Sequence, residues 1–148
     1  MDSARESILE LMNEYCYRID RGDLQAFADL FSDGTWLVQG DPSGGDTGSA
    51  AVMETLQNII LYDGKPNTKH VMSNILLQID PGGETASAQC YITVNQAVPP
   101  DFPLQPIFIG HYYDSFSCID GSWRFKLRDI QPDLAGDLSH HRADFQKS

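Results

Sequence analysis

The sequence has few cations and no basic cluster. Its 148 residues contain 10 Lys and Arg against 21 Asp and Glu, which gives a formal net charge of -11. Without a run of Lys or Arg to follow a phosphate backbone, the chain is not expected to bind nucleic acid. The acidic charge also repels anionic lipid headgroups and anionic ligands at long range. The expected partner is therefore a small molecule that is neutral or weakly acidic.

Long hydrophobic runs are also absent. The most apolar stretches, at 59–61 and 75–77, are each cut short by polar residues, so no segment is expected to span a bilayer. The first residues lack the basic region and apolar run of a signal peptide. We therefore expect a cytoplasmic protein with no membrane partner.

Cysteine is scarce, and the motifs of metal and nucleotide sites are missing. Cys16, Cys90 and Cys118 are odd in number and widely spaced, which is typical of buried thiols and of neither a disulfide framework nor a metal site. His140 and His141 are adjacent, so a regular element could not point both at one metal. No glycine-rich phosphate loop follows a strand. The sequence predicts neither a metal nor a cofactor.

The length suits one domain over residues 1–148, and the first part of it favours helices. Gly22 is expected to end a first helix, Asp23 to cap a second and Ser49 to cap a third whose apolar stripe reaches Ile60. A short strand is predicted at 35–38. The stripe of the first helix consists of Ile8, Leu11, Met12, Tyr15, Cys16 and Ile19.

The rest of the chain favours long strands joined by hairpin turns. They are predicted at 68–79, 85–98, 107–119 and 123–130. Helices followed by a strand meander indicate an α+β fold in which helices cover one face of a curved antiparallel sheet and leave a conical pocket. The proline-rich segment 99–106 is expected to be a loop across the pocket mouth. The tail from 131 is expected to be a short helix closing the cone or a partly ordered end.

Two polar residues occupy positions that suit acid–base chemistry. Asp20 extends the apolar stripe of the first helix, although it could equally end the helix and face water. His70 opens a strand whose mixed face also carries Met72, Asn74 and Leu76, which suits a ligand cavity, although a solvated histidine needs no function. A neutral imidazole oriented by a carboxylate can abstract a proton.

A further set of residues could line or charge the pocket. Arg128 alternates with Arg124 and Lys126, which is typical of a solvated face, but at the pocket it could stabilise an enolate or a leaving group. Aromatic residues at such periodicities are more often core residues. The predicted pocket residues are Tyr15, Trp36, Asn74 and His111.

Three segments together resemble the SnoaL-like branch of the nuclear-transport-factor-2-like superfamily. They are Tyr15-Cys16-Tyr17-Arg18-Ile19-Asp20-Arg21-Gly22-Asp23 leading to Leu30-Phe31, then Thr68-Lys69-His70-Val71-Met72-Ser73-Asn74, then Asp120-Gly121-Ser122-Trp123-Arg124-Phe125. The resemblance covers nearly the whole chain. It implies a cone-shaped, cystatin-like fold in which three N-terminal helices and a curved sheet surround a pocket.

Within that superfamily the chain is similar to scytalone dehydratase and hexachlorocyclohexane dehydrochlorinase. The resemblance places Asp20 and His70 on the positions of a catalytic dyad for cofactor-free elimination, and Arg128 on that of an arginine in the dehydrochlorinase. It also implies that 131–133 belongs to a tail that closes over the ligand. The sequence departs from these relatives at Tyr15, where the dehydrochlorinase has a lysine, and at Ile19 and near Cys90, where the dehydratase has a tyrosine and a histidine.

These patterns favour a cofactor-independent lyase that acts on a small cyclic or aromatic compound. An isomerase or cyclase with the same dyad remains an alternative, because each begins with proton abstraction. So does a non-catalytic module that binds a ligand or supports an enzyme, as the small subunits of ring-hydroxylating dioxygenases do. In every case we expect a homo-oligomer, a dimer or a trimer, formed through the open sheet face.

Overall fold

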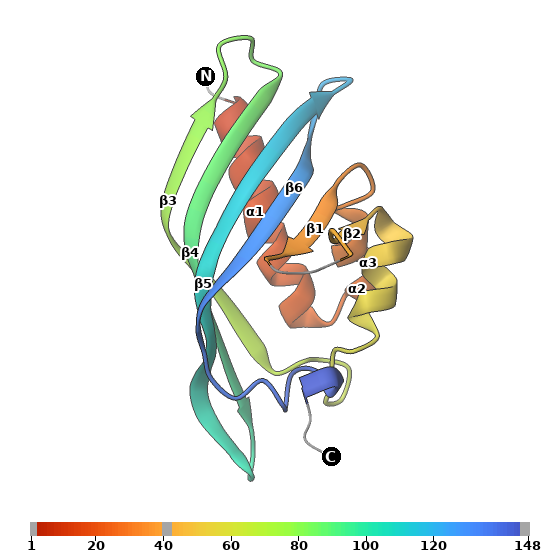
Figure 1. The fold of residues 1–148 in the computed structure, drawn as a ribbon, viewed down its shortest axis with the longest axis vertical. Helices are drawn as coiled ribbons and strands as arrows, with labels where there is room; N and C mark the ends of the chain where they lie inside the picture. The colour runs from red at the N-terminus through yellow and green to blue at the C-terminus, as the bar shows by residue number, and fades with distance from the viewer. Residues whose placement is uncertain (1–2, 40–42, 146–148) are drawn as a thin grey trace.

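The computed structural model describes residues 3–39 and 43–145, which form the predicted α+β fold (Figure 1). The N-terminal part contains the helices α1 (Ser3–Arg21), α2 (Leu24–Asp29) and α3 (Ser49–Leu56), with the short strands β1 (Thr35–Val38) and β2 (Asp46–Thr47) between α2 and α3. The C-terminal part contains four long strands and a final 3-10 helix: β3 (Thr68–Ile79), β4 (Thr85–Val98), β5 (Phe102–Ile119), β6 (Ser122–Ala135) and η1 (Ala143–Phe145). None of the described helices is long and apolar enough to cross a membrane.

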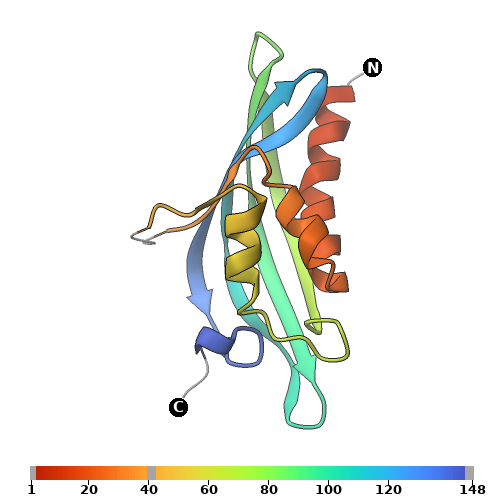
Figure 2. The same ribbon diagram turned by 90° about the vertical axis from the view of Figure 1, so that its right-hand side faces the viewer.

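All six strands belong to one curved sheet in the order β2-β1-β6-β5-β4-β3. Neighbouring strands are antiparallel except β1 and β6, which run parallel. Helix α1 packs against both β3 and β6, and α2 contacts α1 and α3 (Figures 1 and 2). The sheet therefore wraps the helices from one side, and the apolar core lies between the two layers.

A bulge in β3 reverses which side chains face the helices. The register with β4 shifts between Ser73 and Leu76, and Asn74 has a φ of 57°. Beyond the bulge Leu77 is half-buried whereas Leu76 is 66% exposed. The predicted alternation is therefore right from His70 to Met72 and wrong from Asn74 on, because a bulge adds one residue and bends the strand.

A second bulge, in β6, turns Arg128 inward. Ser115 pairs with Leu127 and Phe116 pairs with Phe125, which leaves Lys126 as the extra residue. Phe125 and Arg128, three positions apart, consequently both face the core with exposed fractions of 0%. The alternation that groups Arg128 with Arg124 and Lys126 on a solvated face is wrong for this reason.

Several predicted boundaries are confirmed and others change. Strands β1, β3 and β4 have the predicted ends, whereas β5 already begins at Phe102, so the proline-rich segment is partly strand, and none of residues 99–106 lines the cavity that contains His70. Helix α3 ends at Leu56, short of Ile60, and its cap position is held by Gly48. Asp23 holds the cap position of α2 without a side-chain hydrogen bond.

Gly22 ends α1, as predicted, and allows a close backbone approach. Its φ is +80°, and a Cβ placed there would lie 2.0 Å from the carbonyl oxygen of Gly64. Gly64 belongs to the turn that leads into β3. The end of the first helix is therefore packed directly against the turn that precedes the first long strand.

We predict that Gly22→Ala lowers the free energy of unfolding by more than about 2 kcal/mol, because it adds both an unfavourable φ and a collision with backbone. Gly82→Ala is the control, since its backbone has no such φ and its Cβ would meet no atom within 4 Å. Urea denaturation of both variants measures the effect. Equal losses in the two variants would contradict the role given to Gly22.

Candidate active site

Asp20 and His70 are in direct contact. The Nδ1 atom of His70 lies 2.7 Å from Oδ1 of Asp20, and the backbone N–H of His70 donates to Oδ2 at 2.8 Å. The hydroxyl of Thr68 donates to Oδ1 at 2.7 Å. The side chains of His70 and Asp20 are only 8% and 9% exposed. The reading of Asp20 as a solvated helix end is therefore wrong.

The carboxylate determines the tautomer of the imidazole. Burial alone would raise the pKa of Asp20, but its hydrogen bonds and its charge interaction with His70, together with the bond from Thr68, outweigh burial and lower it. An ionised carboxylate can only accept hydrogen bonds, so Nδ1 of His70 carries a proton. In the neutral ring Nε2 then has the free lone pair, and no described residue binds it. This is the arrangement of an oriented general base.

His70 faces an apolar cavity of about 320 Å³ between the helices, the sheet and the tail. Its wall is formed mainly by aliphatic and aromatic side chains from both layers. The tail contributes Leu138, His141, Arg142 and Phe145 to the wall, whereas residues 131–133, which the resemblance placed in a closing tail, belong to strand β6. The polar side chains at the wall are Tyr15, Trp36, His70, Tyr112, His141 and Arg142.

The structure brings two of the four predicted pocket residues to this cavity. Tyr15 and Trp36 line it, and the indole Nε1 of Trp36 donates to the hydroxyl of Tyr15 at 3.1 Å. The Tyr15 hydroxyl also forms a hydrogen bond with Tyr112. Burial raises the pKa of both tyrosines, although Arg128 opposes the shift, so both keep their protons at neutral pH.

Asn74 and His111 do not line the cavity, and their assignment to it is corrected. Asn74 is exposed within the β3 bulge. His111 lies on the opposite face of β5 from Tyr112, where its ring stacks on Tyr113 at 4.8 Å. Its Nδ1 is 3.6 Å from a carboxylate oxygen of Asp133. Both corrections follow from strand parity, because one residue of displacement moves a side chain to the other face.

Arg128 lies in the core and does not line the cavity, contrary to the predicted contact with a ligand. Its Nε and Nη2 donate to the two carboxylate oxygens of Asp114 at 2.8 and 2.7 Å. The guanidinium carbon is 4.3 Å from the ring centre of Tyr15 and 4.0 Å from that of Tyr112. Burial would lower the pKa of Arg128, but Asp114 raises it; burial in turn raises the pKa of Asp114, against the effect of Arg128. The two short, parallel hydrogen bonds are those of a bidentate ion pair. Arg128 therefore supports two aromatic side chains of the cavity wall.

His141 is one of three polar cavity residues that the sequence analysis missed, together with Tyr112 and Arg142. Its ring lines the cavity with its centre 6.4 Å from that of His70, and the residue is 8% exposed. Adjacent His140 instead stacks on Phe102 with ring centres 4.1 Å apart. Adjacent residues of a regular element cannot both point at one site, but one of the two can still reach it. Only the path of the tail distinguishes them.

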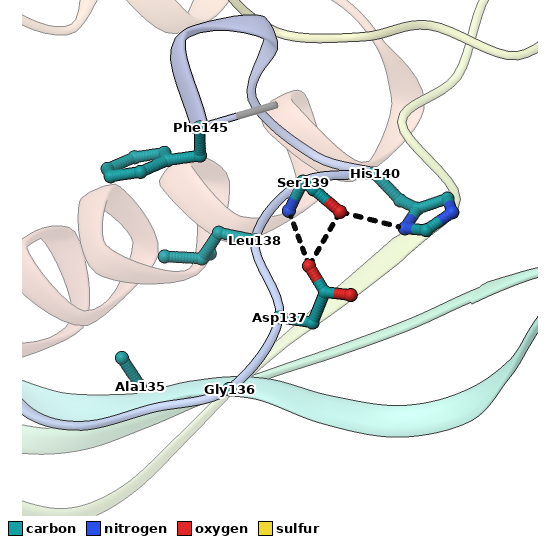
Figure 3. Close-up of a pocket in the computed structure, with 7 residues that line it drawn as sticks. All are labelled: Ala135, Gly136, Asp137, Leu138, Ser139, His140 and Phe145. Atoms are coloured by element: carbon teal, nitrogen blue, oxygen red, sulfur yellow. Dashed lines mark hydrogen bonds between the residues drawn. The ribbon is translucent and has the colours of Figure 1, made fainter. Parts of the chain in front are cut away.

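A second hollow, lined by the tail, is larger but carries no comparable chemistry. It measures about 1040 Å³ and is lined by residues 135–140 and Phe145 (Figure 3). Ser139 donates to Asp137 at 2.6 Å and lies 3.3 Å from Nδ1 of His140. Because the hydroxyl is directed to the carboxylate of the same turn, these contacts stabilise the turn and do not activate a nucleophile. Within 3–39 and 43–145, no group of three or more His, Cys, Asp or Glu could hold a metal ion.

Comparison with known proteins identifies the family and the fold. The family model described as SnoaL-like domain matches residues 3–129. No curated protein matches the chain. Solved structures that match include a protein of unknown function with a cystatin-like fold from Nostoc punctiforme, with 22% identity, coverage of 90% of this chain and 94% of that one, and a TM-score of 0.71.

The names of two further matching structures refer to an enzymatic reaction. A candidate scytalone dehydratase from Novosphingobium aromaticivorans has 25% identity and a TM-score of 0.72, over 90% of this chain and 87% of that one. LinA, a hexachlorocyclohexane dehydrochlorinase, has 16% identity and a TM-score of 0.70, over 89% and 87%. The resemblance seen in the sequence and the cystatin-like fold are thus confirmed.

The buried ion pair predicts an asymmetric response to mutation. Asp114→Leu should lower the free energy of unfolding by about 3 kcal/mol or more, because it leaves the Arg128 charge buried and unpaired. The double variant Asp114→Leu, Arg128→Met should be more stable than the single variant. Asp33→Ala breaks an exposed pair with Arg124 and should change stability by less than about 1 kcal/mol. Chemical denaturation that finds the double variant less stable than the single one would contradict this account.

The burial of His141 predicts a specific pH dependence. Burial, His70 and Arg142 lower the pKa of His141 to about 3, with Asp20 opposing. The pKa of a histidine in the unfolded chain is about 6.5. At pH values between about 6.5 and about 3, His141 is therefore protonated in the unfolded state and neutral in the folded state, so the free energy of unfolding falls as the pH falls. From pH 7 to pH 5 the wild type should lose about 2 kcal/mol more than His141→Gln. Parallel urea curves at the two pH values test this, and identical losses would show that His141 is protonated in the folded protein.

Proposed function

The chain belongs to the SnoaL-like domain family, and from that membership and its buried dyad we propose a cofactor-independent lyase that acts on a small cyclic or aromatic compound. The observation that carries the proposal is the 2.7 Å contact between Asp20 and Nδ1 of His70, which leaves Nε2 as a base at an apolar cavity. The names of LinA and of the candidate scytalone dehydratase support the reaction class.

The proposed reaction begins when Nε2 of His70 takes a proton from a carbon of the bound compound. The electron pair of the broken C–H bond forms a new C=C bond, and a leaving group departs from the neighbouring carbon with its own bonding pair. The carboxylate of Asp20 stabilises the imidazolium that forms. If the leaving group is hydroxide, the imidazolium returns the proton to it and water is released. Atoms and charge then balance without an added cofactor.

The apolar wall of the cavity strengthens the interaction between Asp20 and the protonated ring of His70. In a site that excludes water the attraction between Asp20 and the imidazolium is larger than in solution. Arg128 contributes indirectly, because it holds Tyr15 and Tyr112 in place from behind while Asp114 neutralises its charge. We therefore assign Arg128 a positioning role and Asp20 and His70 the catalytic roles.

An isomerase or cyclase would use the same first step, so the dyad supports it as well. The difference lies in whether a leaving group departs after proton abstraction. A non-catalytic module does not require a carboxylate bonded to a buried histidine at the cavity, and the observed contact therefore favours an enzyme over it.

Self-association through the outer sheet face remains part of the proposal. Val71, Leu76, Tyr91 and Tyr113 are large apolar side chains with exposed fractions between 38% and 66%. Apolar side chains gathered on one face of a small protein often mark a contact with another chain. A homodimer formed through this face would leave the cavity, on the other side of the sheet, unobstructed.

The test is a screen of hydroxylated and halogenated cyclic compounds without added cofactor, followed by comparison of variants on any compound that reacts. His70→Ala should lower kcat/KM by about 10²–10⁴-fold, since it removes the general base. Asp20→Asn should also lower it strongly, because the imidazole loses its orienting charge. His111→Ala, on the far face of the sheet, is the matched control and should retain wild-type turnover.

Circular dichroism must show that each variant is folded, and product analysis separates elimination from isomerisation. Turnover that survives both Asp20→Asn and His70→Ala would refute the dyad. Ligands that bind to folded wild-type protein but never react across the screen would favour the binding module.

A further inference from the structure

His141 is a buried polar side chain at the cavity wall with no hydrogen-bond partner among the described residues. Its Nδ1 is fully enclosed and unpaired. The other polar groups are engaged: His70 with Asp20, Tyr15 with Trp36, and Arg142 with Asp144. A buried polar group without a partner destabilises the protein unless something else satisfies it.

The surroundings of His141 favour one tautomer. Three groups act on its ring electrostatically: His70 on β3, whose ring centre is 6.4 Å away, Asp20 on α1, and Arg142, the next residue of the tail. The ring is neutral at physiological pH, so it has one N–H and one lone pair. Among backbone groups, an enclosed N–H without an acceptor is rarer than a carbonyl without a donor, and we apply the same order to this ring. Nδ1 therefore holds the lone pair, and Nε2–H is the donor that is left for the cavity.

We propose that His141 donates a hydrogen bond to an oxygen of the ligand, so that the compound bound beside His70 is an oxygenated ring, a cyclic ketone or its equivalent, and not a halogenated hydrocarbon. The role of this hydrogen bond in catalysis rests on the proposed function. The hydrogen bond itself does not, because it can be tested by ligand binding alone. A ring without oxygen would leave the donor unpaired, and a site with a dedicated donor discriminates strongly against such a ring.

The two histidines then have complementary tasks. His70 offers a lone pair and His141 offers a proton donor, with ring centres 6.4 Å apart, so one small molecule can contact both. When Nε2 of His70 takes a proton from the carbon next to a carbonyl, the C–H electron pair forms the enolate C=C bond. The carbonyl π electrons move to oxygen, where the N–H of His141 stabilises the charge.

The backbone of the tail fixes the position of this donor. The carbonyl oxygen of His141 accepts from the N–H of Ile60 at 2.9 Å, and the N–H of Ala143 donates to the carbonyl of Asn58 at 2.7 Å. These bonds join the tail to the segment after α3 on both sides of the ring. His141 is thus held in place before any ligand arrives, as expected for a specificity-determining residue.

The experiment compares the binding of 1-tetralone and tetralin, which differ by one carbonyl oxygen, by equilibrium dialysis at pH 7. The ratio of the two Kd values cancels their different hydrophobicity when variants are compared with the wild type. His141→Phe should shift the ratio against 1-tetralone by about tenfold, the effect of one hydrogen bond. His141→Gln, which retains a donor, should stay near the wild type, and so should His140→Phe, which lies outside the cavity.

An unchanged ratio in folded His141→Phe would overturn the proposal, as would a shift produced by Tyr15→Phe in its place. If His141→Phe does not fold, the proposal can be tested on the wild-type protein, by the ¹³C chemical shift of the carbonyl of bound, labelled 1-tetralone. It should move downfield from its position in hexane, and a hexane-like position would overturn the proposal. Because these measurements need no turnover, failure of the lyase screen and failure of this inference are distinguishable.

Discussion

One carboxylate joins the two layers of this protein directly behind the histidine that faces its cavity. Asp20, in the last turn of α1, accepts hydrogen bonds from Thr68 and from both the backbone and the ring of His70. All three donors belong to the first residues of β3, so the direction in which the helix crosses the sheet and the orientation of the imidazole depend on the same group. The close approach of Gly22 to Gly64 holds the chain together at the same point. Asp20 therefore serves both the packing of α1 against β3 and the orientation of the His70 ring.

A second buried pair, Arg128 with Asp114, lies behind the apolar wall of the cavity. Arg128 and Asp114 are fully enclosed and form a bidentate contact beneath the rings of Tyr15 and Tyr112, although Nη1 of Arg128 has no hydrogen-bond partner among the described residues. Their charges are thus kept from the ligand, while the rings that they support form part of the wall. The cavity therefore presents two imidazoles and tyrosine hydroxyls in an environment of low polarity, which strengthens each hydrogen bond that a ligand makes there.

Periodicity predicted most of the fold, because helical and strand patterns depend on local sequence. Asp20 and His70 were found in this way, one as a break in an apolar stripe and one on a mixed strand face. The β3 bulge and the parity of β5 explain why Asn74 and His111 were misplaced, since neither bulges nor strand faces are marked by residue type. The β6 bulge likewise explains why Arg128 lies in the core and not on the solvated face that the alternation predicts. His141 could not be separated from His140, because its position depends on long-range bonds of an irregular tail. The single-domain assignment over 1–148 and the oligomeric state remain predictions.

Whether Asp20 orients His70 as a base can be decided by ¹⁵N NMR of the histidine side chains at a pH where the rings are neutral. For His70 the account predicts a protonated, pyrrole-type Nδ1 and an unprotonated, pyridine-type Nε2 in the wild type, with this preference lost in Asp20→Asn. A wild-type His70 protonated at Nε2 would contradict it, because the ring would then present a donor to the cavity and no base.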